Sequence, residues 1–508
     1  MSKGFFISCA IDYPNAKLHM GHVYEKTVAD VIARVHRLNG EKVLFTVGTD
    51  EHGEKIAESA KHANLPPKQF VDEMSAEFQK LMDMALISYD RFVRTTDADH
   101  VKAAQHFFQL MWDNDDIYPD MYEGWYCVSD ETFWTEKDTV EKLGKRFCPN
   151  THCGKELKKV KEESYFFKWS AFQKKLEEWY AQTPGNVFPE FRKKEMENFL
   201  KQGLHDVSFS RKSIKWGIPT PVNPEHTMYV WSDALVNYLT VCGFPEKKYT
   251  DFWPADVHVI GMDINRFHSL LWPAMLMSAN IALPKQVIVH GFVNDENGIK
   301  FSKSLGNGVD PLQIIPKYGM EALRYYLLRE VPLGNDIAFS EKNLVERANS
   351  ELGNSLGNLV FRVLSMMEKY TNGVIPDAAL NEAVLQQARV HAQEAYRFYL
   401  EHDIQNALVQ VMKVSAVGNK FIADTEPWKL MKEGKRAEVE SLLATEIEII
   451  RVLSILLAPV LPQTCEKIIS QIGFEKPSFT ALNKTPSLSG KKIVKGPVLF
   501  PKFEIEKK

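Results

Sequence analysis

The first fifty residues alternate between short apolar runs and one longer amphipathic segment, and this order limits the fold more than any other feature. Phe5 to Ile11 is an apolar run of strand length, and Val43 to Val47 is another. Between them, apolar residues recur at helical spacing from Val23 to Leu38, and Asn39-Gly40 marks the helix end. A strand, a helix and a strand in this order predict a parallel sheet with a right-handed crossover.

Two histidines stand where that helix is predicted to begin, outside the carboxyl end of the first strand, where such sheets bind their ligands. His19 and His22 are three residues apart, so both imidazoles can face an anion attracted by the free N–H groups of the first turn. Gly21 has no side chain and would let a flat base approach the backbone. We interpret the histidines as hydrogen-bond donors to a triphosphate. Taken alone, the motif fits an exposed histidine pair equally well.

A second motif lies nearly 280 residues later, in a lysine-bearing loop from Gly298 to Gly306. Glycine on both flanks suits a loop that closes over phosphates, and Lys300 and Lys303 surround Ser302. The compact charge of lysine can follow a pyrophosphate group as it leaves. Without the histidines, an ordinary solvated basic loop would be the better reading.

Carboxylates follow two other predicted strands. Asp50 comes after the second strand and can neutralise a substrate ammonium group. Gly261 and Asp263 end a further apolar strand, where a carboxylate can accept hydrogen bonds from both ribose hydroxyls. A glycine and an aspartate after a strand are common, so this signal is weak by itself.

Together, these motifs resemble those of the methionyl-tRNA synthetases, a class I aminoacyl-tRNA synthetase family, over roughly residues 5 to 475. The segments that carry the resemblance are residues 10–15, 19–22, 48–53, 229–238, 263–268 and 298–307. Phe301 departs from the family pattern, which has methionine at that position of the loop. The change should matter little, because the lysines carry the charge.

The resemblance implies a methionine pocket in which Asp50 holds the α-ammonium group. The other implied pocket residues are Ala10, Ile11, Tyr13, Trp231, Tyr238, Ile264 and His268. An aromatic box of this kind suits the long, polarizable thioether side chain of methionine. For any one of these aromatics, plain core packing is the simpler explanation, and only their joint match favours a pocket. The related enzymes for leucine, isoleucine and valine carry a large editing domain, which a chain of 508 residues would struggle to hold.

The middle of the chain contains three of the six cysteines, Cys127, Cys148 and Cys153. Many members of the family have a zinc knuckle here, but Asp130 stands where its second cysteine would be. Closed structural zinc sites are built overwhelmingly from cysteine and histidine. We therefore consider a bound zinc possible but favour a decayed knuckle, and we assign no metal ligand.

The last third of the chain has helical periodicity. Apolar residues step by three or four from Leu344 to Met367, and Asn354, Asn358 and Arg362 step by four on another face. Amide and guanidinium groups can read exposed base edges, and the resemblance implies that this helix reads the anticodon. It likewise implies that Trp428 stacks on an anticodon base. Without the resemblance, the polar residues would be explained as the solvent-exposed face of an amphipathic helix, and Trp428 as part of the core of the helical bundle.

We expect an α/β fold, a Rossmann-type doubly wound parallel sheet interrupted by a connective insertion and followed by an α-helical bundle that binds the anticodon. The expected parts are the first half of the catalytic domain (1–115), the insertion (116–230), the second half with the lysine loop (231–340), the helical domain (341–478) and a C-terminal extension (479–508). No appended dimerising domain remains to be placed, which suggests a monomer.

Composition agrees with an intracellular enzyme. With 44% apolar and 25% charged residues the chain is globular, and its net charge of −4 excludes a globally basic nucleic-acid binder. Six sparse cysteines argue for a reducing compartment, and the sequence has neither a signal peptide nor a membrane-spanning run. We expect a cytoplasmic protein.

The hypothesis is that the protein uses ATP and Mg²⁺ to join L-methionine to tRNA(Met) through methionyl-adenylate, with His19, His22, Lys300 and Lys303 stabilising the transition state. Gly21, Gly261, Asp263 and Ser302 would complete the ATP site with the two lysines. One alternative is a small-molecule nucleotidyltransferase, which would have no use for the helical third. Another is a non-catalytic tRNA-binding paralogue, in which the histidines and lysines would be idle.

Overall fold

The protein is described by a computed structural model that covers residues 3–15, 18–128, 132–134, 136–150, 153–301 and 307–505. It consists of two compact units. The first, the sheet unit, comprises residues 1–18, 44–83 and 89–290, and the second, the helical unit, comprises residues 19–43, 84–88 and 291–508. None of the helices in the described part of the chain combines the length and the apolarity needed to cross a membrane.

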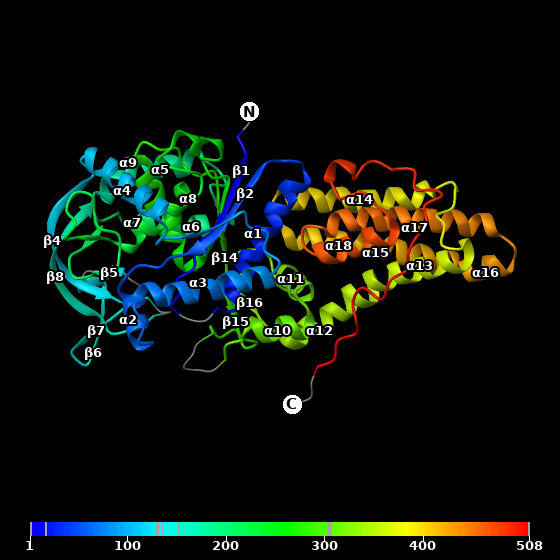
Figure 1. The fold of residues 1–508 in the computed structure, drawn as a ribbon, viewed down its shortest axis with the longest axis horizontal. Helices are drawn as coiled ribbons and strands as arrows, with labels where there is room; N and C mark the ends of the chain where they lie inside the picture. Colours follow the sequence, from blue (N-terminus) through cyan, green and yellow to red (C-terminus); the bar gives the residue numbers. More distant parts are fainter. Residues whose placement is uncertain are drawn as a thin grey trace. The chain divides into compact units, whose positions relative to one another are not determined.

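The sheet unit is built on a six-stranded sheet with the order β3-β2-β1-β13-β14-β9 (Figure 1). The strands are β1 (Phe5–Cys9), β2 (Val43–Thr49), β3 (Arg91–Arg94), β9 (Val187–Phe188), β13 (Val257–Gly261) and β14 (Val287–His290). The pairs β1–β13, β13–β14, β14–β9 and β2–β3 are parallel. Every residue of β13 and β14 is buried, as expected for strands with both faces covered. The predicted doubly wound parallel sheet is confirmed.

The strand order reverses between β1 and β13. Strands β1, β2 and β3 follow one another toward one edge of the sheet, and β13 and β14 follow one another toward the other edge, which is formed by β9. This is the switch point where open α/β sheets bind ligands, outside the carboxyl ends of their strands. Ala10 follows β1, Asp50 follows β2, and Asp263 follows β13. The fold thus carries these predicted site residues at the carboxyl ends of its central strands.

The helices of the sheet unit follow its strands along the chain. They are α2 (Glu54–His62), α3 (Pro67–Met84), α4 (Ala98–Asp113), α5 (Gln173–Gln182), α6 (Glu190–Leu200), α7 (Val230–Ala234), α8 (Asn237–Thr240) and α9 (Trp272–Ser278). The apolar core of this unit includes Phe6, Phe107, Tyr238 and Trp272, all at most 1% exposed.

A second, antiparallel sheet lies in the range predicted to be an insertion, with the order β10-β8-β4-β5. Its strands are β4 (Ile117–Cys127), β5 (Thr132–Trp134), β8 (Lys158–Phe167) and β10 (Val207–Ser208). The same range also holds the pairs β6 (Val140–Lys142) with β7 (Lys145–Phe147) and β11 (Ser210–Arg211) with β12 (Thr227–Met228). One strand within this range, β9, belongs to the main sheet instead. The domain boundaries given above remain predictions.

The helical unit contains α1 and most of the C-terminal half (Figure 1). Its helices are α1 (Met20–Leu38), α10 (Pro311–Tyr318), α11 (Met320–Arg329), α12 (Glu341–Arg347), α13 (Asn358–Thr371), α14 (Glu382–Leu400), α15 (Ile404–Thr425), α16 (Pro427–Lys432), α17 (Arg436–Leu457) and α18 (Pro462–Ile472). A parallel pair, β15 (Val293–Asn294) with β16 (Ile337–Ala338), precedes and follows the lysine loop. Near the C-terminus, Lys492 forms a single antiparallel bridge with Val374.

The predicted helix from Leu344 is interrupted by a wider turn. A π-helical segment, η6 (Ala348–Gly357), separates α12 from α13. The predicted apolar positions are nevertheless buried, with Leu344, Leu352, Leu356 and Met367 all at 0% exposure. Sequence spacing thus identified the buried face but not the change of helix type.

A buried ion pair fixes α1 within the helical unit. Arg324 of α11 and Asp30 of α1 have fully buried side chains, and Nη2 of Arg324 donates to the Asp30 carboxylate at 2.6 Å. The guanidinium also donates to the carbonyls of Val460 at 2.9 Å and Ala85 at 3.2 Å. Burial alone would raise the pKa of Asp30, but Arg324 and further donors outweigh it and hold that pKa below its usual value. One side chain therefore joins α1, α11, the residue 84–88 segment and the end of α17.

Replacing Arg324 with Leu should lower the free energy of unfolding by about 3–5 kcal/mol, because Asp30 and the carbonyl groups of two other segments lose a buried donor. Denaturation followed by tryptophan fluorescence would measure the loss. Arg397→Leu is the matched control, because Arg397 forms ion pairs with Glu394 and Glu401 at the surface of α14. It should change stability far less. Equal losses in both variants would contradict a special role for the buried pair.

Candidate active site

The two histidines cap the N-terminus of α1. His19 is the N-cap residue, and its Nδ1 accepts a hydrogen bond from the Gly21 backbone N–H at 3.1 Å. The Nδ1 of His22 accepts from the His19 backbone N–H, also at 3.1 Å. A Cβ on Gly21 would lie 3.0 Å from the His19 ring, so the missing side chain makes room for this arrangement. The two rings lie 3.9 Å apart between centroids.

This capping box fixes which ring nitrogen of each histidine can carry a proton. A backbone N–H can only donate, so each Nδ1 must be unprotonated to accept its hydrogen bond. The neutral ring then carries its proton on Nε2. Both histidines therefore present an N–H donor that the cap does not use, at a helix end that itself favours anions.

Lys300 lies close enough to the histidine pair to act on it. Loss of hydration, followed by the positive charges of His22, Lys300 and Lys26, lowers the pKa of His19 to about 2. The His19 imidazole is therefore neutral at physiological pH and donates as a dipole. Lys300 is itself exposed, with its Nζ 4.2 Å from the centroid of the Phe292 ring. Lys300 is thus near enough for its charge to act on His19, while the joint role of the histidines and the lysine stays a prediction.

The base of the lysine loop is held by one carboxylate. Asp295 accepts hydrogen bonds from the backbone N–H groups of Asn297 and Ile299, both at 2.9 Å, and from the Asn307 side chain at 2.8 Å. These contacts, the Asn307 amide foremost, lower the pKa of Asp295. The two ends of the loop are thereby tied together. Lys303 and Ser302 lie outside the described residues.

The carboxyl end of β13 carries the predicted ribose-binding residues. A Cβ on Gly261 would lie 2.8 Å from an Asp263 carboxylate oxygen, so a side chain here would displace that carboxylate. Asp263 is exposed and available to a ligand. At the end of β2, Asp50 is buried, and its backbone N–H donates to the Asp12 carbonyl at 2.8 Å.

The residues predicted to bind methionine gather in the sheet unit. Ala10 and Tyr238 belong to its apolar core, and Ile11, Tyr13, Trp231 and Ile264 pack against that core while remaining partly exposed. Trp231 stacks on Phe267 with ring centroids 3.9 Å apart and planes 9° from parallel, and it meets His268 edge-on at 6.1 Å. Phe267 belongs to the same aromatic group, although we had not predicted it as a site residue.

A hydrogen-bond chain orients Tyr238. The His268 Nδ1 lies 3.1 Å from the Ile264 carbonyl, which can only accept, so Nδ1 carries the proton. The neutral His268 Nε2 then accepts from the Tyr238 hydroxyl at 2.7 Å. Three predicted pocket residues are thus fixed relative to one another by two hydrogen bonds.

Sequence reasoning missed a buried network behind these residues. The Asp233 carboxylate accepts hydrogen bonds from His52 and from His100, both at 2.7 Å. Burial alone would raise the pKa of this carboxyl, but the charges and hydrogen bonds of the two histidines outweigh burial and hold the pKa below its usual value. The backbone carbonyl of His52 in turn accepts from the Tyr13 hydroxyl at 2.7 Å. Asp233 thereby links α7, which carries Trp231, to the segment after β2. Its partners lie 181 and 133 residues away, so no local signal reveals the network.

The predicted anticodon residues lie on the helical unit. Asn354 in η6 and Asn358 in α13 are exposed, and Arg362 is partly exposed. Trp428 in α16 is 40% exposed, which is unusual for a tryptophan and excludes the alternative that it fills the bundle core.

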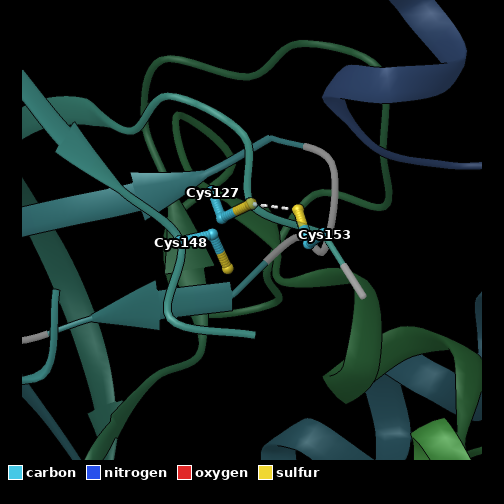
Figure 2. Close-up of side chains that lie close together, drawn as sticks. All are labelled: Cys127, Cys148 and Cys153. Carbon is cyan, nitrogen blue, oxygen red and sulfur yellow. Dashed lines mark hydrogen bonds between the residues drawn. The ribbon is translucent and has the colours of Figure 1, made fainter. Parts of the chain in front are cut away.

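Three thiols come together beside the antiparallel sheet (Figure 2). The Sγ atoms of Cys127, Cys148 and Cys153 lie within 4.8 Å of one another, with Cys127 and Cys153 3.5 Å apart. All six cysteines are free thiols. A tetrahedral zinc with bonds of about 2.3 Å holds its sulfur ligands about 3.8 Å apart, so this donor set fits the ion. Asp130 and His152, which could supply a fourth ligand, lie outside the described residues.

Comparison with known families agrees with this geometry. The family model described as tRNA synthetases class I (M) matches residues 5–364. A second model, described as the anticodon binding domain of methionyl tRNA ligase, matches residues 375–508. The fold and the site define a class I aminoacyl-tRNA synthetase.

Similar proteins extend the comparison to the whole chain. A methionine–tRNA ligase of Caldanaerobacter subterraneus subsp. tengcongensis is 42% identical over 517 residues, which span 100% of this chain and 80% of the relative. One from Thermotoga maritima is 40% identical over 508 residues, 98% of this chain and 80% of the relative. Mycobacterium tuberculosis methionyl-tRNA synthetase in complex with methionyl-adenylate superposes with a TM-score of 0.95 at 39% identity, covering 98% of this chain and 100% of that one. The chain belongs to the methionyl-tRNA synthetase family, whose members are methionine–tRNA ligases.

Proposed function

We propose that this protein activates L-methionine with ATP to form methionyl-adenylate and then transfers the methionyl group to tRNA(Met). The observation that carries the proposal is the capping of α1 by His19 and His22, with the charge of Lys300 acting on His19, in a chain of this family. Such a cluster of donors suits a triphosphate under attack. Neither a nucleotidyltransferase nor a non-catalytic paralogue accounts for both this cluster and the helical unit.

In the first step, the methionine carboxylate attacks the α-phosphorus of ATP and pyrophosphate leaves. The Nε2–H groups of His19 and His22 donate to phosphate oxygens as negative charge builds, and Lys300 with Lys303 follows the departing pyrophosphate. ATP enters as its magnesium complex, in which Mg²⁺ neutralises part of the triphosphate charge. No side chain acts as a nucleophile, because positioning and electrostatics supply the rate.

The sheet unit would hold the rest of the adenylate. Gly261 and Asp263 of this unit bind the ribose. In the helical unit, Gly21 lets the base approach and Ser302 contacts the phosphates. The thioether lies among Tyr13, Trp231, Tyr238 and His268, lined further by Ala10, Ile11 and Ile264, and Asp50 holds the ammonium group. Stacking of Trp231 on Phe267 gives this pocket a rigid wall, so discrimination rests on shape, with each methylene worth roughly 1–3 kcal/mol.

The direct test is exchange of labelled pyrophosphate into ATP with each amino acid in turn. Exchange should depend on methionine and should exceed that with leucine, isoleucine or valine by orders of magnitude. Exchange with none of the amino acids, despite tRNA binding, would instead establish the non-catalytic alternative.

Replacing Lys300 with Ala should slow methionine-dependent pyrophosphate exchange about 100-fold, because a charge that acts mainly in the transition state is lost. The dissociation constant for methionine, measured by tryptophan fluorescence, should hardly change. Lys342→Ala is the control, since Lys342 is an exposed lysine of α12 in the same unit. An unchanged exchange rate in Lys300→Ala would remove the assigned role.

For the tRNA, we propose that Asn354, Asn358 and Arg362 read the anticodon and that Trp428 stacks on one of its bases. Support comes from the exposure of Asn354, Asn358 and Trp428 on a unit whose residues 375–508 match an anticodon-binding family. Protruding amides and an exposed indole are what unpaired bases require.

Replacing Trp428 with Ala should raise KM for tRNA about tenfold or more, because stacking one base contributes roughly 1–3 kcal/mol. Pyrophosphate exchange without tRNA should stay the same. Leu400→Ala, at a 44% exposed apolar residue of α14, is the control and should leave KM for tRNA unchanged. If both variants behave like the parent protein, Trp428 does not contact the anticodon.

We also propose that Cys127, Cys148 and Cys153 hold a zinc ion, contrary to the decayed knuckle favoured by the sequence. The support is the close approach of three thiols beside Leu157, Trp125 and Trp134, which shield them from water. Bound zinc would stabilise this corner of the insertion and take no part in the chemistry.

The zinc proposal predicts about one zinc per chain after purification under reducing conditions, measured by mass spectrometry. Cys148→Ala should lose the metal, and its thermal midpoint should fall. Cys242→Ala is the control, because Cys242 is buried elsewhere in the sheet unit, and this variant should keep the metal. A parent protein that stays free of zinc after incubation with the ion would contradict the proposal.

We further propose that the protein acts as a monomer in the cytoplasm. The support is its family, whose reaction belongs to translation, together with six free thiols, which suit a reducing compartment.

A further inference from the structure

The helical unit contains an acid that the proposed function does not use. Glu446 of α17 is 0% exposed, and neither of its carboxyl oxygens has a hydrogen-bond partner among the described residues. It lies in a largely apolar stretch with Leu442, Leu443 and Ile450. Buried carboxyls are normally paired, so an isolated one in a helix core calls for an explanation.

A glycine makes room for this carboxyl. A Cβ on Gly418 of α15 would lie 2.7 Å from Oε2 of Glu446 and 3.2 Å from Leu359 of α13. The acid therefore sits where α13, α15 and α17 meet. Arg362 follows Leu359 by one helical turn of α13, at the same junction, and it is one of the residues proposed to read the anticodon.

Arg362 is the charge that acts on this acid. Burial raises the pKa of Glu446 to about 8, and the positive charge of Arg362 offsets part of that rise. Within the described residues, Arg362 makes no ion pair. Several charged groups on elements that pack against α17 are engaged elsewhere, namely Lys420 with Asp424, Lys429 with Glu426, and Arg397 with Glu401, and Glu448 of α17 itself pairs with Arg451.

We propose that Glu446 is a positioning residue for Arg362 and that its protonation state controls how readily Arg362 binds the tRNA anticodon. This inference rests on the anticodon role proposed above for Arg362. A neutral carboxyl leaves the guanidinium free to turn outward toward RNA. After the carboxyl has released its proton to solvent, the buried carboxylate attracts the guanidinium inward and competes with the RNA for it.

The direction of the pH effect follows from the chemistry. Raising the pH through about 8 ionises Glu446, so KM for tRNA should increase between pH 7 and pH 9. Glu446→Gln keeps the shape of the protonated side chain and cannot ionise. Its KM for tRNA should stay nearly constant over the same range, several-fold below that of the parent protein at pH 9.

The experiment measures KM for a tRNA(Met) transcript in aminoacylation at pH 6.5, 7.5, 8.5 and 9, for the parent protein and for Glu446→Gln. Methionine-dependent pyrophosphate exchange without tRNA should be equal in the two proteins at every pH, which separates positioning from general damage. Parallel pH profiles of KM for tRNA in the two proteins would overturn the inference.

Thermal midpoints check that the variant folds and that the carboxyl is protonated. In the folded parent protein Glu446 keeps its proton up to about pH 8, whereas in the unfolded chain it loses the proton above about pH 4.5. The free energy of unfolding of the parent protein therefore falls as the pH rises from about 4.5 to about 8. Glu446→Gln should therefore be increasingly more stable than the parent from pH 5 to pH 9. A constant difference would also overturn the inference.

The variant Arg362→Gln separates the anticodon role proposed for Arg362 from the positioning role proposed for Glu446. An unchanged KM for tRNA in Arg362→Gln would refute the anticodon role of Arg362, and the inference would fall with it. If Arg362→Gln raises KM at pH 7 while Glu446→Gln keeps the parent's pH profile, the anticodon role stands and only the part assigned to Glu446 is wrong.

Discussion

The buried contact between Asp30 and Arg324 holds together the part of the protein that carries the histidines. Asp30 lies in the middle of α1, eight residues after His22, and Arg324 reaches from it to the carbonyls of two other segments. A buried charge pair demands exact partners, so it fixes the rotation and position of a helix more strictly than apolar packing does. The position of α1, the helix that begins at the two histidines, is therefore set by the packing of the helical unit.

Much of the fold follows from periodicity that is visible in the sequence. The strand, helix and strand near the N-terminus occur as β1, α1 and β2, because short apolar runs around a long amphipathic segment leave few alternatives. The edge strand β9 was missed, since two residues carry no periodic signal. The π-helical turn of η6 was missed as well, because the burial of Leu352 and Leu356 is compatible with either helix type.

Part of the candidate site could likewise be predicted from the sequence, and part of it could not. His19, His22, Trp231 and Tyr238 were found from motifs that lie within short stretches of sequence. The network of Asp233 with His52 and His100, and the isolated Glu446, depend on partners brought together only by folding. A glutamate inside an apolar helical stretch was a visible signal for Glu446, but its neighbour Gly418 was not. The cysteine cluster is the opposite case. The ligand spacing in the sequence argued against a zinc site, whereas the fold places the three thiols close together.

The capping of α1 has a consequence for the kind of catalyst these imidazoles can be. Both Nδ1 atoms are committed to backbone amides, so neither ring can pass a proton from one nitrogen to the other without breaking the start of its own helix. The two rings are therefore held rigidly as N–H donors, in contrast to the proton relays of hydrolases. Such an arrangement suits a displacement in which no proton has to move, and the lowered pKa of His19 keeps that ring neutral over the physiological range.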